Sequence, residues 1–139
     1  MRPTLDELRA FLASEFPQSP VTLLAIGDGT ARVRHDVDER HLRPGGTISG
    51  PVMMATADAA TYIALLSKIG IVPLAVTSNL SIAFLRRPKA DRALIGEATL
   101  LKVGRKLAFA EVRLMSEGEM DPVAHATVTY AIPAAHADV

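Results

Sequence analysis

The feature that most constrains this chain is a glycine-rich loop that runs directly into a long apolar segment, between residues 45 and 68. Pro51 fits the first turn of a helix, where its missing N–H needs no partner. Ser49 or Gly50 is the expected N-cap of this helix. Residues 52–66 are apolar on nearly every helical face, and such a helix is usually buried. The rest of the chain is therefore expected to surround it.

The only charge on this apolar stretch is Asp58. The run is shorter than 20 apolar residues and carries an acid midway, so the sequence predicts a buried helix rather than a membrane span. No membrane partner is expected. The chemical question is why a buried helix should carry a carboxylate.

Length and composition narrow the function classes. At 139 residues the chain is expected to form one domain over residues 1–139, with an N-terminal helical extension over 1–20 and a flexible tail over 133–139. The net charge is zero, so no nucleic-acid partner is expected. There is no cysteine, and the four histidines lack metal-site spacing, so no metal is expected. The charged start has no signal-type apolar core, which predicts a cytoplasmic protein.

The segments before the central helix have clear patterns. Thr4 and Glu7 form a capping-box pattern at the start of a first helix. Residues 21–26 and 31–35 are expected to be strands joined by a turn over 27–30, and residues 41–49 are expected to be a loop. The apolar face of the first helix comprises Leu5, Leu8, Leu12 and Phe16.

Four further strands are expected after the central helix, over residues 74–85, 94–103, 107–115 and 123–132. Consecutive strands with short turns predict an antiparallel sheet. Only the central helix is apolar enough to cover its inner face, so the fold class is α+β, with a curved sheet wrapped around one helix. In the first of these strands, Thr77, Asn79 and Ser81 are expected to share the face opposite to the apolar side chains.

Several spaced blocks of the sequence resemble one family. The chain is similar, over roughly residues 21–132, to the hotdog-fold acyl-CoA thioesterases of the PaaI-like (phenylacetic acid degradation, 4HBT) type. The resemblance implies a hotdog fold and hydrolysis of an acyl-CoA, with coenzyme A entering only as part of the substrate and no other cofactor. The blocks are Ser49-Gly50-Pro51 with Asp58, residues 76–88, residues 96–105 and residues 124–130.

The family motif implies a role for several positions. Asp58 matches the catalytic acid, Gly50 the first glycine of the motif, and Thr77 a hydroxyl residue that assists the acid. Three positions depart from the motif: Arg43 replaces an asparagine, Ser49 a histidine and Pro51 the second glycine. The departures keep open a second function, that of a non-catalytic or differently catalytic protein that binds acyl thioesters.

Thioester hydrolysis needs hydrogen-bond donors for the carbonyl oxygen and a carboxylate that attacks the carbonyl carbon or activates water. The N-terminus of the central helix offers the Gly50 N–H, and Asp58 offers the carboxylate. At about 1.5 Å per residue, these two groups lie roughly 12 Å apart along one helix. One carbonyl cannot contact both, so a shared site in a homodimer or homotetramer is expected.

Each candidate also has a structural interpretation. Asp58 could be a structural acid hydrogen-bonded to Thr61, Tyr62 or another chain, and Ser49 could be only an N-cap. Thr77 and Asn79 could be ordinary residues of a strand face.

The remaining candidates concern substrate binding. Arg and Lys suit the phosphates of coenzyme A, but charges at strand ends often only solvate a rim. An apolar pocket wall is expected from Met53, Met54, Tyr62 and Leu65. The full set of candidate binding residues is Arg43, Met54, Tyr62, Asn79, Arg86, Arg87 and Arg105.

Overall fold

The structure is a computed structural model that describes residues 2–134. Its main sheet is built from β1 (Thr22–Gly27), β2 (Thr30–His35), β5 (Val76–Phe84), β6 (Leu94–Val103), β7 (Leu107–Ser116) and β8 (Ala124–Ala131). The other elements are α1 (Leu5–Glu15), the short η1 (Glu39–His41), the hairpin β3 (Leu42–Arg43) and β4 (Thr47–Ile48), and the central helix α2 (Gly50–Ile69). Most of the tail expected over 133–139 lies outside the described residues.

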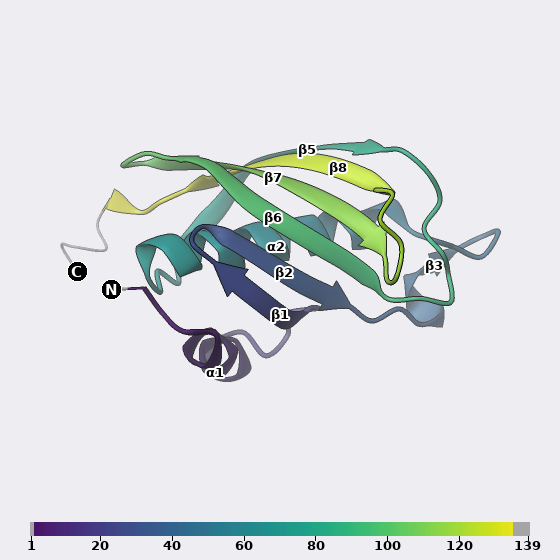
Figure 1. Cartoon of the computed structure of the whole chain (residues 1–139), viewed down its shortest axis with the longest axis horizontal. Coiled ribbons are helices and arrows are strands. Elements are labelled where there is room, and N and C mark those ends of the chain that lie inside the picture. The colour runs from purple at the N-terminus through teal and green to yellow at the C-terminus, as the bar shows by residue number, and fades with distance from the viewer. Residues whose placement is uncertain (1, 135–139) are drawn as a thin grey trace.

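The six strands pair antiparallel in the order β1-β2-β6-β7-β8-β5 and curve around α2 (Figure 1). This confirms the α+β architecture expected from the sequence. The segment 41–49 was expected to be only a loop, but it contains the two-stranded β3–β4 hairpin. Strands of two residues are too short to leave a periodic pattern.

Helix α2 forms the core because small side chains let the sheet approach it closely. Ala57, Ala60 and Ala64 have no exposed surface. On the sheet side, a Cβ added at Gly96 of β6 would lie 3.2 Å from Thr56 of α2, so glycine is needed for this packing. The helix ends where Gly70 takes a positive φ of 97° and donates its N–H to the Leu66 carbonyl.

The length argument against a membrane span was wrong, because α2 has 20 residues. Its length and composition would allow it to cross a bilayer, but 61% of its apolar window is buried in the fold. Buried core helices of globular proteins have the same length and composition, so α2 gives no argument for a membrane.

Helix α1 packs beside β1 at one side of the molecule (Figure 1). Thr4 and Glu7 form the expected capping box, and Leu8, Phe11 and Leu12 are buried. Phe16 lies just beyond the helix and packs its ring against Tyr62 of α2, with ring centroids 6.3 Å apart. Phe11 of α1 contacts the same ring, so α1 and the residue that follows it pack on the central helix at Tyr62.

Strand β5 lies at an edge of the sheet and has a bulge that the sequence did not reveal. Its pairing with β8 shifts between Thr77, which lies opposite Tyr130, and Asn79, which lies opposite Thr129. Paired residues share a face, so Thr77 joins buried Tyr130 on the inner face while Asn79 lies on the outer face. The expectation that Thr77 and Asn79 share one face was wrong, because Ser78 is the extra residue.

Candidate active site

Asp58 lies in the middle of α2, and two hydroxyl groups hold one of its carboxylate oxygens. The Tyr130 hydroxyl donates to Oδ1 over 2.9 Å, and the Thr77 hydroxyl donates to the same oxygen. Among the described residues, no hydrogen bond engages Oδ2 of Asp58. The carboxylate is therefore fixed in position while one oxygen stays available for chemistry.

Tyr130 is a stable donor in this arrangement. Its side chain is 3% exposed. Burial, and then the nearby negative charge of Asp58, raise the pKa of Tyr130 far above its ordinary value. The phenol consequently stays protonated at neutral pH and donates its hydrogen to the carboxylate.

Two of the structural partners considered for Asp58, Thr61 and Tyr62, do not bind it. The Thr61 hydroxyl donates to the Ala57 carbonyl over 3.0 Å, and the Tyr62 hydroxyl donates to the Pro73 carbonyl over 3.1 Å. Neither residue contacts the carboxylate through a hydrogen bond. Instead the partners come from β5 and β8, which are distant from Asp58 in sequence.

Asp58 opens into a pocket of about 650 Å³. Tyr62 and Thr77, two of the predicted site residues, line this pocket with it. Aromatic and small apolar side chains form most of the wall, and part of it comes from α1, which the sequence had not connected with the site. The lining consists of Phe11, Glu15, Phe16, Pro20, Ala55, Asp58, Ala59, Tyr62, Pro73, Ala75, Val76, Thr77 and Tyr130.

A second pocket, of about 420 Å³, lies at the N-terminus of α2. It contains Gly50 together with three of the predicted basic residues, Arg43, Arg86 and Arg87. Arg86 lies 3.6 Å from Asp121, whereas Arg43 and Arg87 form no ion pair with any residue between 2 and 134. Positive side chains and a helix N-terminus together make this pocket suitable for an anion.

Gly50 supplies a free donor at this second pocket. Its N–H takes part in no hydrogen bond within the described part of the chain. The aromatic ring of Phe84 packs so closely that a Cβ added at Gly50 would lie 3.3 Å from it. Ser49 is the N-cap by backbone position, but its side chain makes no capping hydrogen bond.

The structure does not bring all predicted site residues together. Asp58 and Gly50 line different pockets, one near each end of β5, since Val76 and Thr77 line the first and Phe84 lines the second. Ser49, Met54, Asn79 and Arg105 line neither pocket.

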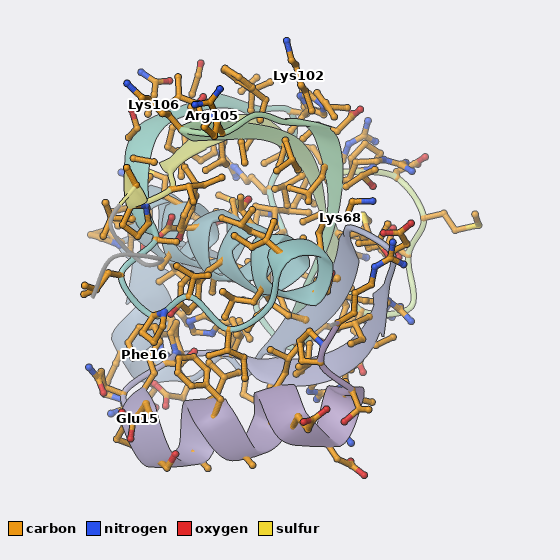
Figure 2. All side chains as sticks on the ribbon, turned by 90° about the vertical axis from the view of Figure 1, so that its left-hand side faces the viewer. Glu15, Phe16, Lys68, Lys102, Arg105 and Lys106 are labelled. Atoms are coloured by element: carbon orange, nitrogen blue, oxygen red, sulfur yellow. The ribbon has the colours of Figure 1, made fainter. Side chains whose placement is uncertain are left out.

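Arg105 follows β6, in the turn that leads to β7. Figure 2 shows it with Lys102 and Lys106 at the top of the view, on the opposite side of the molecule from α1. Proximity to a strand end in the sequence did not reveal at which end of the sheet a basic residue would lie.

The sequence reasoning missed Tyr130, Phe11, Glu15 and Phe16 as site residues. Tyr130 alternates with Thr129 in the sequence of its strand and lies buried on the inner face, where a tyrosine hydroxyl usually needs a partner. That rule could have connected it with the lone acid of α2. No cluster of three metal-ligating side chains occurs among residues 2–134.

Comparisons with known proteins agree with this architecture. The thioesterase superfamily model (4HBT) matches residues 45–131. A protein from Silicibacter sp. TM1040 that is provisionally named a thioesterase is 48% identical, with 92% of this chain and 90% of that chain covered and a TM-score of 0.83. A search of curated proteins gave no significant match.

Two more distant structures share the fold. A point mutant of the phenylacetic acid degradation protein PaaI from Thermus thermophilus is 25% identical, with 89% of this chain and 99% of that chain covered and a TM-score of 0.72. The smu.793 protein from Streptococcus mutans UA159, solved with acetyl CoA bound, is 21% identical, with 81% and 88% covered and a TM-score of 0.72.

Proposed function

Because this chain belongs to the thioesterase superfamily, we propose that it hydrolyses an acyl-CoA thioester to the free acid and coenzyme A. The observation that carries the proposal is the Asp58 carboxylate, which lines an apolar pocket with one oxygen held and one oxygen available. The acetyl CoA bound to the Streptococcus mutans neighbour supports a coenzyme A thioester as the substrate class.

The proposed reaction follows from this carboxylate. As a general base, Asp58 takes a proton from water while the water oxygen attacks the carbonyl carbon. As a nucleophile, it attacks the carbon itself and forms an anhydride that water then hydrolyses. In both routes the C–S bond breaks, the sulfur of coenzyme A leaves with its electron pair and is protonated, and the acid is released. Neither route needs a further cofactor.

Negative charge develops on the carbonyl oxygen during this reaction, and the free Gly50 N–H at the positive end of α2 is a suitable donor for it. Pro51 cannot donate, so Gly50 carries this role alone among the first two helical residues. Within one chain, however, Gly50 and Asp58 line different pockets. The proposal therefore requires Gly50 of the partner subunit.

Strand β5 offers a way to assemble such a site. It is an edge strand whose free backbone groups can pair with another strand, and its Val76 and Phe84 are 55% and 51% exposed. If two copies pair antiparallel about a two-fold axis near Leu80, the Thr77 end of one β5 meets the Phe84 end of the other. Each Asp58 pocket then adjoins the Gly50 pocket of the second subunit.

Coenzyme A would then enter from the Gly50 pocket. Arg43, Arg86 and Arg87 lie there, and two of these side chains have no ion pair with the described residues. Guanidinium groups suit phosphates. The acyl group would occupy the Asp58 pocket, with the carbonyl group between the two.

The test is a panel of acyl-CoA thioesters, with release of free thiol followed by a thiol-reactive dye. We expect turnover by the wild type and its loss in Asp58→Asn. If no thioester in the panel is hydrolysed but coenzyme A thioesters bind in calorimetry, the binding-protein alternative replaces the enzyme. In that case the departures at Ser49 and Pro51 are the first positions to restore.

A further inference from the structure

We propose, on the basis of the proposed function, that α1 forms the wall of the acyl pocket and that Glu15 makes this pocket reject acyl groups with a terminal carboxylate. Glu15 is the last residue of α1 and lines the pocket together with Asp58. Figure 2 shows Glu15 and Phe16 close together at the left-hand end of α1.

Aromatic rings form the wall of the Asp58 pocket from α1 to Asp58 itself. The rings of Phe11 and Phe16 each contact Tyr62, with centroids 6.4 and 6.3 Å away. Tyr62 in turn stacks on Tyr130 at 6.0 Å, and Tyr130 holds Asp58. An acyl group that leaves the carbonyl carbon near Asp58 therefore extends along apolar rings toward α1.

The charges of this pocket have one sign. Its lining contains the acids Asp58 and Glu15 and no Lys, Arg or His. Glu15 forms no ion pair with any described residue, so its charge is not neutralised by a neighbour. The free terminal carboxylate of a dicarboxylic acyl group would lie near the negative charge of Glu15 without a compensating cation. Like charges in proximity oppose binding.

Helix stability does not explain Glu15. An acid at a helix C-terminus interacts unfavourably with the helix dipole, and α1 has no basic residue in its last turn. Removing the charge should therefore leave α1 as stable as before or stabilise it. A change in substrate preference can then be separated from a change in folding.

The experiment compares hexanoyl-CoA with adipoyl-CoA, which has the same chain length and a terminal carboxylate. We expect wild type to prefer hexanoyl-CoA, and Glu15→Gln to raise the ratio of kcat/KM for adipoyl-CoA to kcat/KM for hexanoyl-CoA about three- to tenfold, the scale of one partly exposed like charge. Asp6→Asn is the matched control, because Asp6 is an exposed acid of α1 outside the pocket. An equal effect on both substrates, or an equal effect of Asp6→Asn, overturns the proposal.

Product acids separate this proposal from the proposed function. If the wild type hydrolyses neither thioester, binding of hexanoate and adipate is measured by ligand-observed NMR. Preference for hexanoate that Glu15→Gln reduces supports the pocket assignment even without catalysis. Equal binding of the two acids by wild type, or binding of neither, overturns it.

A separate observation assigns a role to Tyr130. We infer that Tyr130 is a positioning residue, which directs the free oxygen of Asp58 toward the substrate by holding the other oxygen. Its hydroxyl lies 2.9 Å from Oδ1 and 3.3 Å from the backbone carbonyl oxygen of Asp58. Thr77 donates to the same Oδ1, so both donors act on one oxygen.

Two donors on one oxygen limit the rotation of the Asp58 carboxylate. Removing the Tyr130 hydroxyl should therefore let the other oxygen leave its position for attack or proton transfer, which lowers kcat more than it changes KM. Tyr62 serves as an internal control, because its hydroxyl donates to the Pro73 carbonyl and not to Asp58.

The test is the separate measurement of kcat and KM for Tyr130→Phe and Tyr62→Phe. We expect Tyr130→Phe to lower kcat with little change in KM, and Tyr62→Phe to lower kcat less, although both remove one hydroxyl from neighbouring stacked rings. An unchanged kcat in Tyr130→Phe, or an equal fall of kcat in both variants, overturns the inference. If the protein lacks turnover, a crystal structure of Tyr130→Phe gives the decision: a displaced or doubly occupied Asp58 carboxylate supports the inference, and an unmoved carboxylate overturns it.

Discussion

At the scale of single residues, the central finding is how Asp58 is satisfied. A lone carboxylate on an apolar helix is costly unless it has hydrogen-bond partners. Here both partners are hydroxyl groups, Thr77 and Tyr130, and both donate to one oxygen. This leaves a half-buried carboxylate that is held firmly and is still able to accept a proton or attack carbon.

Replacing Asp58 by asparagine should keep the shape of the site and remove its charge. We expect kcat to fall by about 10² to 10⁴, the usual effect of losing a positioned acid–base group. The free energy of unfolding should change little, because the amide can still accept from Thr77 and Tyr130. Thiol release and urea unfolding measure the two quantities. A folded variant with nearly wild-type kcat would exclude catalysis by Asp58.

His35 should make folding stability depend on pH. Its side chain is 5% exposed, and burial lowers its pKa. The folded protein therefore resists a proton that the unfolded chain accepts below about pH 6.5. The stability from neutral His35 is complete above that pH and is lost as pH falls toward the lowered pKa. We expect weaker urea resistance at pH 5.5 than at pH 7.5, with a smaller difference in His35→Gln.

At the scale of elements, the periodicity of apolar residues predicted most of the helices and strands. The features that it did not predict depend on how the strands pair and on which elements pack together. The apolar pattern of residues 52–66 and the alternation in β7 and β8 identify the helix and the faces that cover it. The bulge in β5 has no sequence pattern, so the inward position of Thr77 could not be predicted. The same limit hid the contact between α1 and the pocket, because an amphipathic pattern identifies the buried face but not its partner.

The basic pocket at the start of α2 gives a prediction at this scale. Replacing Arg86 and Arg87 together by alanine should raise KM for acyl-CoA thioesters more than it lowers kcat, because phosphate contacts hold substrate and transition state alike. Arg105→Ala is the matched control, since Arg105 lines neither pocket. Steady-state kinetics measure kcat and KM for both variants. An unchanged KM in the double variant would mean that Arg86 and Arg87 are solvated surface charges that do not bind the phosphates.

At the scale of the whole molecule, one chain contains the carboxylate and the helix N-terminus that the proposed reaction needs, but it does not bring them together. The carboxylate and the helix N-terminus lie in different pockets, with edge strand β5 between them. We therefore predict a homo-oligomer built from dimers. Sedimentation at micromolar concentration should show a dimer or tetramer, and a monomer mass would contradict the shared site.

Subunit mixing tests the shared site directly. Asp58→Asn and Gly50→Val should each be inactive alone. In a mixed dimer, one of the two sites would have both residues unmutated, Asp58 from the Gly50→Val chain and Gly50 from the Asp58→Asn chain. The other site would have neither. With random mixing in equal amounts, about a quarter of wild-type activity should return. Activity that stays absent in verified mixed dimers would mean that the two residues do not serve the same site.

The extra residue in β5 makes the length of this strand as important as its composition. Ser78 is exposed and shifts the pairing with β8 by one position, which turns Thr77 inward while the strand from Asn79 onward keeps its alternation. Many residues should be acceptable at position 78, because the side chain there contacts solvent. Deleting the position, however, would reverse the faces of Thr77 and Val76 relative to the rest of the strand and would turn the Thr77 hydroxyl away from Asp58. For the contact between Thr77 and Asp58, the number of residues in β5 therefore matters more than the identity of residue 78.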